Sequence, residues 1–182
     1  MNNLADFQTA QQGQTTTEAA LQLFDRLDPL DPEFMIGRWQ GSGFHTNHQM
    51  DGLLEAFNWY GKEFISAEHV HPLLFSDGNN IFKVDPNPIV MNIGLSLPIP
   101  KNEAIKPFYI AMSKMLKTEE SKARIRMMEY RGKVSATMIY DYLPINDVFR
   151  RVDNNTVLGL MDFKGMPQPF FFVLNRKERS LT

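Results

Sequence analysis

The sequence contains no cysteine, so the chain can form neither a disulfide bond nor a thiolate metal site. Its 19 basic and 21 acidic side chains leave a formal net charge of −2, and without a basic excess we expect no nucleic-acid partner. No run of about 18 apolar residues is present, so we expect no membrane-spanning helix. The first residues also lack the basic start and apolar core of a signal peptide. Together these absences predict a cytoplasmic protein.

Strong catalytic and cofactor signatures are missing as well. The sequence has no Gly-x-Ser-x-Gly elbow, no glycine-rich phosphate loop and no Cys–His pair. Its histidines form two close pairs, an arrangement that would suit a zinc or iron site. No acidic residue stands at motif spacing with them, so we expect no metal and no cofactor. The remaining metal candidates are His45, His48, His69 and His71.

The composition is that of a globular protein. With 182 residues, of which 43% are hydrophobic and 22% charged, the chain is long enough for one domain with a substantial core. Residues 1–14 are polar and rich in Gln and Asn, and we expect them to be a flexible N-terminus. Residues 15–182 are predicted to form a single barrel domain, with an N-terminal part of about 20–95 and a C-terminal part of about 120–176.

The stretch Gly37-Arg38-Trp39-Gln40-Gly41 organises the N-terminal part. A Trp buries roughly 150–250 Å² and must be covered, while glycines beside it let neighbouring backbone approach closely. Small closed barrels often begin in this way, with a helix that closes one end of the barrel and a Trp that packs beside it. We therefore predict a structural, barrel-closing role for Trp39 with Gly37 and Gly41, and a ligand contact is the alternative.

Helical periodicity occurs in three places. Apolar residues recur at i, i+3, i+4 and i+7, which predicts amphipathic helices near 16–27, 50–60 and 107–117. In the third helix we expect one face to consist of Phe108, Ala111, Met112 and Met115.

The C-terminal third changes to the period of β-strands. Short segments separated by Gly, Asn or Pro have the spacing of an antiparallel meander, at 123–130, 134–140, 146–152, 157–162 and 169–174. An Asp-Gly turn at 77–78 predicts a hairpin, and a further strand is expected within 89–97. The segment 170–174 is apolar throughout, so both its faces should be buried. The predicted fold is mainly β, a small antiparallel β-barrel with about three flanking helices.

Alternation along these strands places charges on otherwise apolar faces, where a charge is costly unless it is paired. We therefore predict a network around one barrel mouth, either structural or ligand-facing, formed by Asp141, Asp147, Arg150, Asp162 and Lys164. The predicted ligand-binding set adds apolar and aromatic wall residues and comprises Met138, Tyr140, Asp147, Arg150, Met161, Lys164, Phe170 and Phe172.

Several motifs together resemble a known family. The N-terminal part resembles the GXWXG family of uncharacterised, mainly bacterial proteins. The motifs that carry the resemblance are Gly37-x-Trp39-x-Gly41, Met50-Asp51-Gly52-Leu53, Trp59-Tyr60-Gly61-Lys62 and His71-Pro72-Leu73. The C-terminal part resembles the domain that usually follows in this family, a domain of unknown function (DUF4334). Here the motifs are Glu129-Tyr130-Arg131-Gly132, Tyr140-Asp141, Phe149-Arg150 and Met161-Asp162-x-Lys164-Gly165. The resemblance spans about residues 20–176 and implies no particular activity.

A more distant likeness is to lipocalin- and nitrobindin-type barrels, which carry a Gly-x-Trp near their first strand. Nitrobindin-type members take an iron-ligating histidine from late in the chain, and no histidine follows His71, so the likeness does not extend to haem. In lipocalin-type barrels an Arg near the last strand lies over this Trp. Because the first and last strands of a closed barrel must meet, we expect the stretch after 170–174 to return beside Trp39. The likeness then implies that Arg176 stacks on Trp39, a contact favourable by about 0.5–2 kcal/mol, and a solvated position in a basic tail is the alternative.

Lipocalin-type barrels hold apolar ligands, and this likeness supports the leading function hypothesis. According to this hypothesis, the protein binds a small apolar molecule (lipid-, isoprenoid- or aromatic-like) whose polar or acidic head contacts Arg150 or Lys164. The first alternative is a cofactor-free barrel enzyme, an isomerase, cyclase or lyase, with Asp141 or Asp162 as acid or base. The second is a protein-interaction module with a filled barrel. A homodimer is compatible with each of them.

Overall fold

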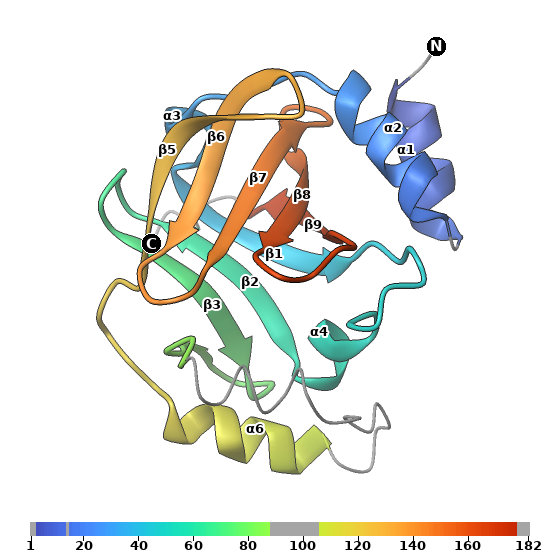
Figure 1. Cartoon of the computed structure of the whole chain (residues 1–182). Helices are drawn as coiled ribbons and strands as arrows, with labels where there is room; N and C mark the ends of the chain where they lie inside the picture. The colour runs from blue at the N-terminus through green and yellow to red at the C-terminus, as the bar shows by residue number, and fades with distance from the viewer. Residues whose placement is uncertain (1–2, 14, 88–105, 178–182) are drawn as a thin grey trace.

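Among the residues described, 3–13, 15–87 and 106–177, a closed antiparallel barrel of eight strands dominates the computed structural model (Figure 1). Around the barrel the strands follow the order β2-β1-β9-β8-β7-β6-β5-β3, and β3 closes the ring by pairing with β2. This arrangement confirms the mainly-β barrel fold. The strands, including the additional β4, are β1 (Gly37–Gly43), β2 (Trp59–Phe64), β3 (Val70–Ser76), β4 (Ile81–Lys83), β5 (Ala123–Tyr130), β6 (Lys133–Tyr140), β7 (Ile145–Arg151), β8 (Thr156–Phe163) and β9 (Phe170–Arg176).

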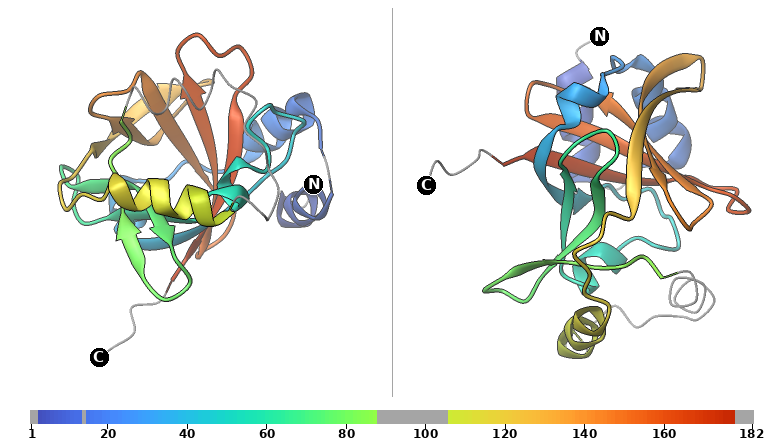
Figure 2. Two further views of the ribbon diagram at one scale, coloured as in Figure 1. Left: turned by 90° about the horizontal axis from the view of Figure 1, so that it is seen from below. Right: turned by 90° about the vertical axis from the view of Figure 1, so that its left-hand side faces the viewer.

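One edge of β3 is shared by two partners. Near its start Val70 pairs with Ala123 of β5, and near its end Leu74 to Ser76 pair with β4. β4 and β5 therefore separate from each other, and the wall of the barrel is split on this side. The split lies toward the end of the molecule where α6 (Lys106–Met115) crosses, as the two views of Figure 2 show.

The other described helices are α1 (Asn3–Gln12), α2 (Thr17–Arg26), α3 (Pro32–Met35) and α4 (Leu53–Ala56). α1 and α2 lie side by side outside the sheet, away from α6 (Figure 1). The helices predicted near 16–27 and 107–117 are confirmed as α2 and α6. No helix in the described ranges is long and apolar enough to cross a membrane.

The structure differs from the sequence-based expectations at two described segments. Residues 3–12, expected to be flexible, form α1, and Phe7 is buried there with its ring 5.9 Å from that of Phe44. The helix expected over 50–60 shrinks to the four residues of α4. Asn58 has a left-handed φ of 56°, which ends the helical turn, and Trp59 already begins β2. The strand expected within 89–97 lies outside the described residues.

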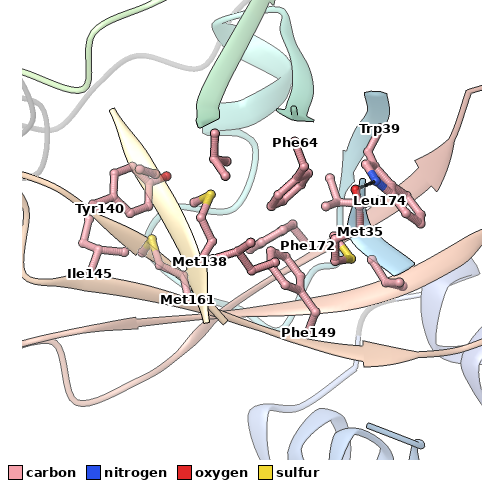
Figure 3. Close-up of a cluster of buried hydrophobic side chains, with 14 of the residues drawn as sticks. Met35, Trp39, Phe64, Met138, Tyr140, Ile145, Phe149, Met161, Phe172 and Leu174 are labelled. Carbon is pink, nitrogen blue, oxygen red and sulfur yellow. Dashed lines mark hydrogen bonds between the residues drawn. The ribbon is translucent and has the colours of Figure 1, made fainter. Parts of the chain in front are cut away.

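Two apolar clusters cover the two faces of the barrel wall. The inner cluster includes Trp39, Met138, Phe149 and Phe172 (Figure 3). The outer cluster lies under α2 and includes Phe24, Leu158, Phe171 and Val173. β9 contributes to both clusters, and Phe170 to Leu174 are all buried. The predicted burial of both faces of this segment is therefore confirmed, because the helix covers the outside of the strand.

Trp39 lies where β1 meets β9 and has no exposed surface. Its Nε1 donates a hydrogen bond to the carbonyl oxygen of Met35 at 2.7 Å (Figure 3). The guanidinium of Arg176 lies 4.3 Å from the Trp39 ring centroid and donates to the carbonyl oxygens of Phe34 and Ile36. The contact that the lipocalin-type likeness implied is thus present, and it ties α3 to the seam between the first and last strands of the barrel.

Two glycines bring β1 and β2 into close contact. A Cβ at Gly41 would lie 2.0 Å from the ring of Trp59, and a Cβ at Gly61 would lie 2.0 Å from the carbonyl oxygen of Trp39. Gly61 also has a φ of 147°, which L residues with a side chain rarely adopt. The ring of Trp59 consequently occupies the space that a side chain at position 41 would fill, and it belongs to the inner cluster.

Candidate functional site

A cavity of about 390 Å³ opens at the end of the barrel that faces α4 and α6. Its outer part is lined by apolar side chains of these helices and of β3, among them Leu53, Phe57, Leu73, Met112 and Leu116. On α6 the inward residues are Tyr109, Met112 and Ser113, whereas Phe108 and Met115 are 66% and 87% exposed. The packed face of this helix is therefore rotated from the expected one, because the helix covers the cavity mouth with its Tyr109 side.

The floor of the cavity holds a buried ion pair. Lys62 of β2 and Asp147 of β7 expose only 3% and 1% of their side chains, and Lys62 Nζ lies 2.8 Å from Asp147 Oδ2. Lys62 Nζ also donates to the carbonyl oxygen of Pro72 at 3.1 Å and to the hydroxyl oxygen of Tyr140 at 3.5 Å. Both members of the pair line the cavity, together with Tyr140.

Aromatic rings surround the ammonium group of Lys62. Its Nζ lies 5.0 Å from the ring centroid of Phe172, 5.6 Å from that of Trp59 and 5.7 Å from that of Tyr140. Such positions are favourable for a desolvated cation. They supplement the contact with Asp147, since taking two charges out of water costs several kcal/mol for each ion.

Burial also changes the acidity of the groups on the floor. It raises the pKa of the Asp147 carboxyl, although the neighbouring charge of Lys62 acts in the opposite direction. Burial and the negative charge of Asp147 raise the pKa of Tyr140 well above its usual range. Tyr140 is therefore a neutral phenol at physiological pH.

Two groups on the floor have unused hydrogen-bonding capacity. Trp59 is 9% exposed, and its Nε1 has no hydrogen-bond acceptor among the described residues. Asp147 Oδ2 is paired with the ammonium of Lys62, whereas Oδ1 of Asp147 has no hydrogen-bond donor within the described part of the chain. A free donor and a free acceptor thus border the same cavity.

Most of the wall residues predicted from the sequence line this cavity, namely Tyr140, Asp147, Met161, Phe170 and Phe172. Met138 is in the inner cluster but does not line the cavity. The aromatic and apolar residues therefore come together much as the strand alternation indicated (Figure 3).

The predicted charged network around a barrel mouth does not form. Arg150 is on the outer face of β7, fully buried, with its guanidinium 4.8 Å from the ring of Phe24 in α2 and a hydrogen bond to the carbonyl oxygen of Tyr130. Asp141 and Lys164 are exposed. Asp162 alternates with the outer-cluster residues Leu158 and Leu160, so it also points away from the interior. Of the five charges, only Asp147 reaches the cavity.

Sequence reasoning missed Lys62 and Trp59 as site residues. The motif Trp59-Tyr60-Gly61-Lys62 belongs to the stretch that was expected to continue a helix, so no strand face could be assigned to it. The signal that could have found Lys62 is the glycine before it, because glycine in a strand marks close backbone approach.

The histidines do not converge on one site. His45 lies 3.3 Å from Glu55, His48 contacts the carbonyl oxygen of Gln168, and His69 contacts Ser66 Oγ. Within 3–13, 15–87 and 106–177, no three His, Asp or Glu side chains are grouped so that they could hold a metal ion. The two-by-two histidine site is therefore not assembled from these residues.

The fold and the cavity define a class of protein, the closed antiparallel β-barrels with an apolar internal cavity. Residues 22–79 match the family described as GXWXG protein, and residues 121–176 match the domain of unknown function DUF4334. The chain is also similar to the crystal structure of a protein from Thermomonospora curvata. The two are 32% identical, with 98% of this chain and 100% of that chain covered and a TM-score of 0.72. The chain belongs to the GXWXG family. No curated protein matches it.

Proposed function

We propose that the protein binds a small, largely apolar molecule in the cavity between the barrel and α6. The observation that supports this function is the cavity itself, since about 390 Å³ is typical of small-molecule sites that combine apolar walls with a few polar groups. At roughly 30 Å³ for a group the size of a water molecule, this volume holds about a dozen non-hydrogen atoms. The polar end of the ligand contacts the floor around Lys62 and Asp147, in place of Arg150 or Lys164.

A ligand panel tests this function. Native mass spectrometry of the protein purified from cells should show a co-purifying apolar molecule. Fatty acids, isoprenoids and small aromatic compounds should include at least one class that raises the melting temperature. The absence of both a co-purifying ligand and any thermal shift would contradict the proposal.

A substitution that fills the cavity provides a second test. Met161→Trp adds volume at the cavity wall and is expected to weaken ligand binding at least about tenfold, which corresponds to about 1.4 kcal/mol. Met127→Trp is the matched control, because the same change is made at a side chain that is 42% exposed. Isothermal titration calorimetry with the best panel ligand measures both variants, and equal affinities would place the ligand elsewhere.

A second candidate function is a cofactor-free enzyme that moves a proton within an apolar substrate. It is supported by Asp147, a buried carboxylate with a raised pKa and free lone pairs beside the cavity. The earlier candidates Asp141 and Asp162 lie outside the cavity, which excludes them from this role. Proton transfer would appear as deuterium uptake from D2O into a bound carbonyl compound, and Asp147→Asn should abolish it.

A further inference from the structure

The floor of the cavity indicates which polar group the ligand carries, provided that the proposed binding function holds. The ammonium of Lys62 is already engaged by Asp147, by the carbonyl oxygen of Pro72 and by the hydroxyl oxygen of Tyr140. An ammonium has three protons to donate. Lys62 consequently has no donor left for a ligand. The groups that these contacts leave unused are Trp59 Nε1–H, the second carboxylate oxygen of Asp147 (Oδ1) and the hydroxyl proton of Tyr140.

The charge balance of the floor excludes ionic ligands. Lys62 and Asp147 neutralise each other, and both are almost completely buried. A carboxylate or phosphate ligand would add a second negative charge next to Asp147, and an amine would add a second positive charge next to Lys62. Neither added charge would have a free counter-charge, and a buried charge without a partner is strongly unfavourable.

Neutral ligands differ in how many of the unused groups they satisfy. A hydrocarbon leaves both Trp59 Nε1–H and Asp147 Oδ1 unpartnered. A ketone, ether or ester can accept from Trp59 Nε1–H or from the hydroxyl of Tyr140, but it leaves Asp147 Oδ1 without a donor. A hydroxyl group accepts one hydrogen bond and donates another. Since a buried polar group without a partner loses its hydration without compensation, a hydroxyl is the group that satisfies both.

We infer that the cavity binds a neutral, largely apolar alcohol whose hydroxyl accepts from Trp59 Nε1–H and donates to the carboxylate of Asp147. This inference narrows the polar or acidic head expected from the sequence to a hydroxyl group. That expectation relied on Arg150, which the structure buries on the outer face of β7, and on Lys164, which is exposed.

The test changes the ligand's head group and leaves the rest of the ligand constant. The probes are phenylbutanol, its methyl ether, phenylbutyrate, phenylbutylamine and butylbenzene, which all fit a space of about a dozen atoms. Calorimetric titration of the full chain at pH 7 is expected to give an affinity for the alcohol about tenfold or more above each of the others, since each fails to make at least one hydrogen bond.

Trp59→Phe is the protein variant that accompanies this series. It removes the indole donor and keeps an aromatic ring on the wall, so the affinity for the alcohol should fall about tenfold while that for butylbenzene stays within about twofold. The unchanged affinity for butylbenzene shows that the cavity of the variant is intact.

The possible outcomes are distinguishable. Equal binding of the alcohol and its methyl ether, or tighter binding of the acid or amine, would overturn the hydroxyl inference and leave the proposed binding function standing. No binding of any probe would contradict both. A fall in the affinity for the alcohol with Trp59→Phe, together with weak binding of the ether, would support the inference in full.

Discussion

Replacing Asp147 by Leu is expected to lower the free energy of unfolding by about 3–5 kcal/mol, because the variant leaves the ammonium of Lys62 buried without a counter-charge. Denaturant unfolding followed by fluorescence measures the change. Asp141→Leu is the matched control, since this aspartate is exposed and its loss should change stability by less than about 0.5 kcal/mol.

The double variant Lys62→Met/Asp147→Leu distinguishes two causes of the expected loss of stability, the unpaired charge of Lys62 and the altered packing around residue 147. Replacing both members of a buried ion pair with apolar residues is often neutral or stabilising. We therefore expect the double variant to be at least as stable as the natural chain within about 1 kcal/mol. If it were as unstable as Asp147→Leu alone, the loss would not arise from an unpaired ammonium.

The same pair gives a pH dependence with a definite sign. Burial raises the pKa of Asp147 in the folded protein above its value of about 3.9 in the unfolded chain. The folded state then binds the proton more tightly, so the contribution of this group to stability falls as the pH rises from the unfolded to the folded pKa. The difference in unfolding free energy between the natural chain and the double variant should fall over that interval, and a flat difference would contradict the raised pKa.

Trp39→Ala is expected to cost about 3–5 kcal/mol, as truncations of large buried aromatic side chains do. The substitution empties a site with no exposed surface, removes the hydrogen bond to Met35 and leaves the guanidinium of Arg176 without the ring that covers it. Chemical denaturation measures the loss. An unchanged midpoint would show that Trp39 does not close the barrel.

Trp59→Ala provides the comparison for Trp39→Ala. Trp59 is also buried, but one side of its ring already faces the cavity, and the penalty for a truncation depends on the cavity that it creates. We therefore expect Trp59→Ala to be less destabilising than Trp39→Ala. The reverse order would indicate that the cavity is filled in solution.

Much of the barrel could be predicted from local sequence. The strands of the C-terminal meander have clear alternation, and turns with Gly or Asn separate them, so their existence and order were accessible. The burial of Phe170 to Leu174 on both faces followed from composition alone. No local pattern links Trp39 and Arg176, which are far apart in the sequence. Closure of the barrel predicted that the last strand returns beside Trp39, and the lipocalin-type likeness then paired the two residues.

The site was less accessible, for two physical reasons. Alternation shows which residues share a face of a strand. It cannot show which face points into the barrel when both faces are covered, and α2 covers the outer face of β7 at Arg150. Asp147 and Arg150 are three positions apart in β7 and therefore lie on opposite faces, yet both were assigned to one network. Farther upstream, Leu53, Leu54 and Phe57 have helical spacing and line the cavity. This spacing predicted a helix as far as residue 60 and concealed the start of β2 at Trp59.

The ion pair on the floor has a consequence for how the two family segments are inherited. Lys62 comes from the segment 22–79 and Asp147 from the segment 121–176, and the barrel closes through the β1–β9 and β3–β5 pairings between them. A gene that encoded only one segment would produce open strand edges and a single buried charge. We therefore expect the two segments to be encoded together in the genomes that contain either of them. If the gene is split between the segments, a folded barrel should form only when both fragments are expressed in the same cell.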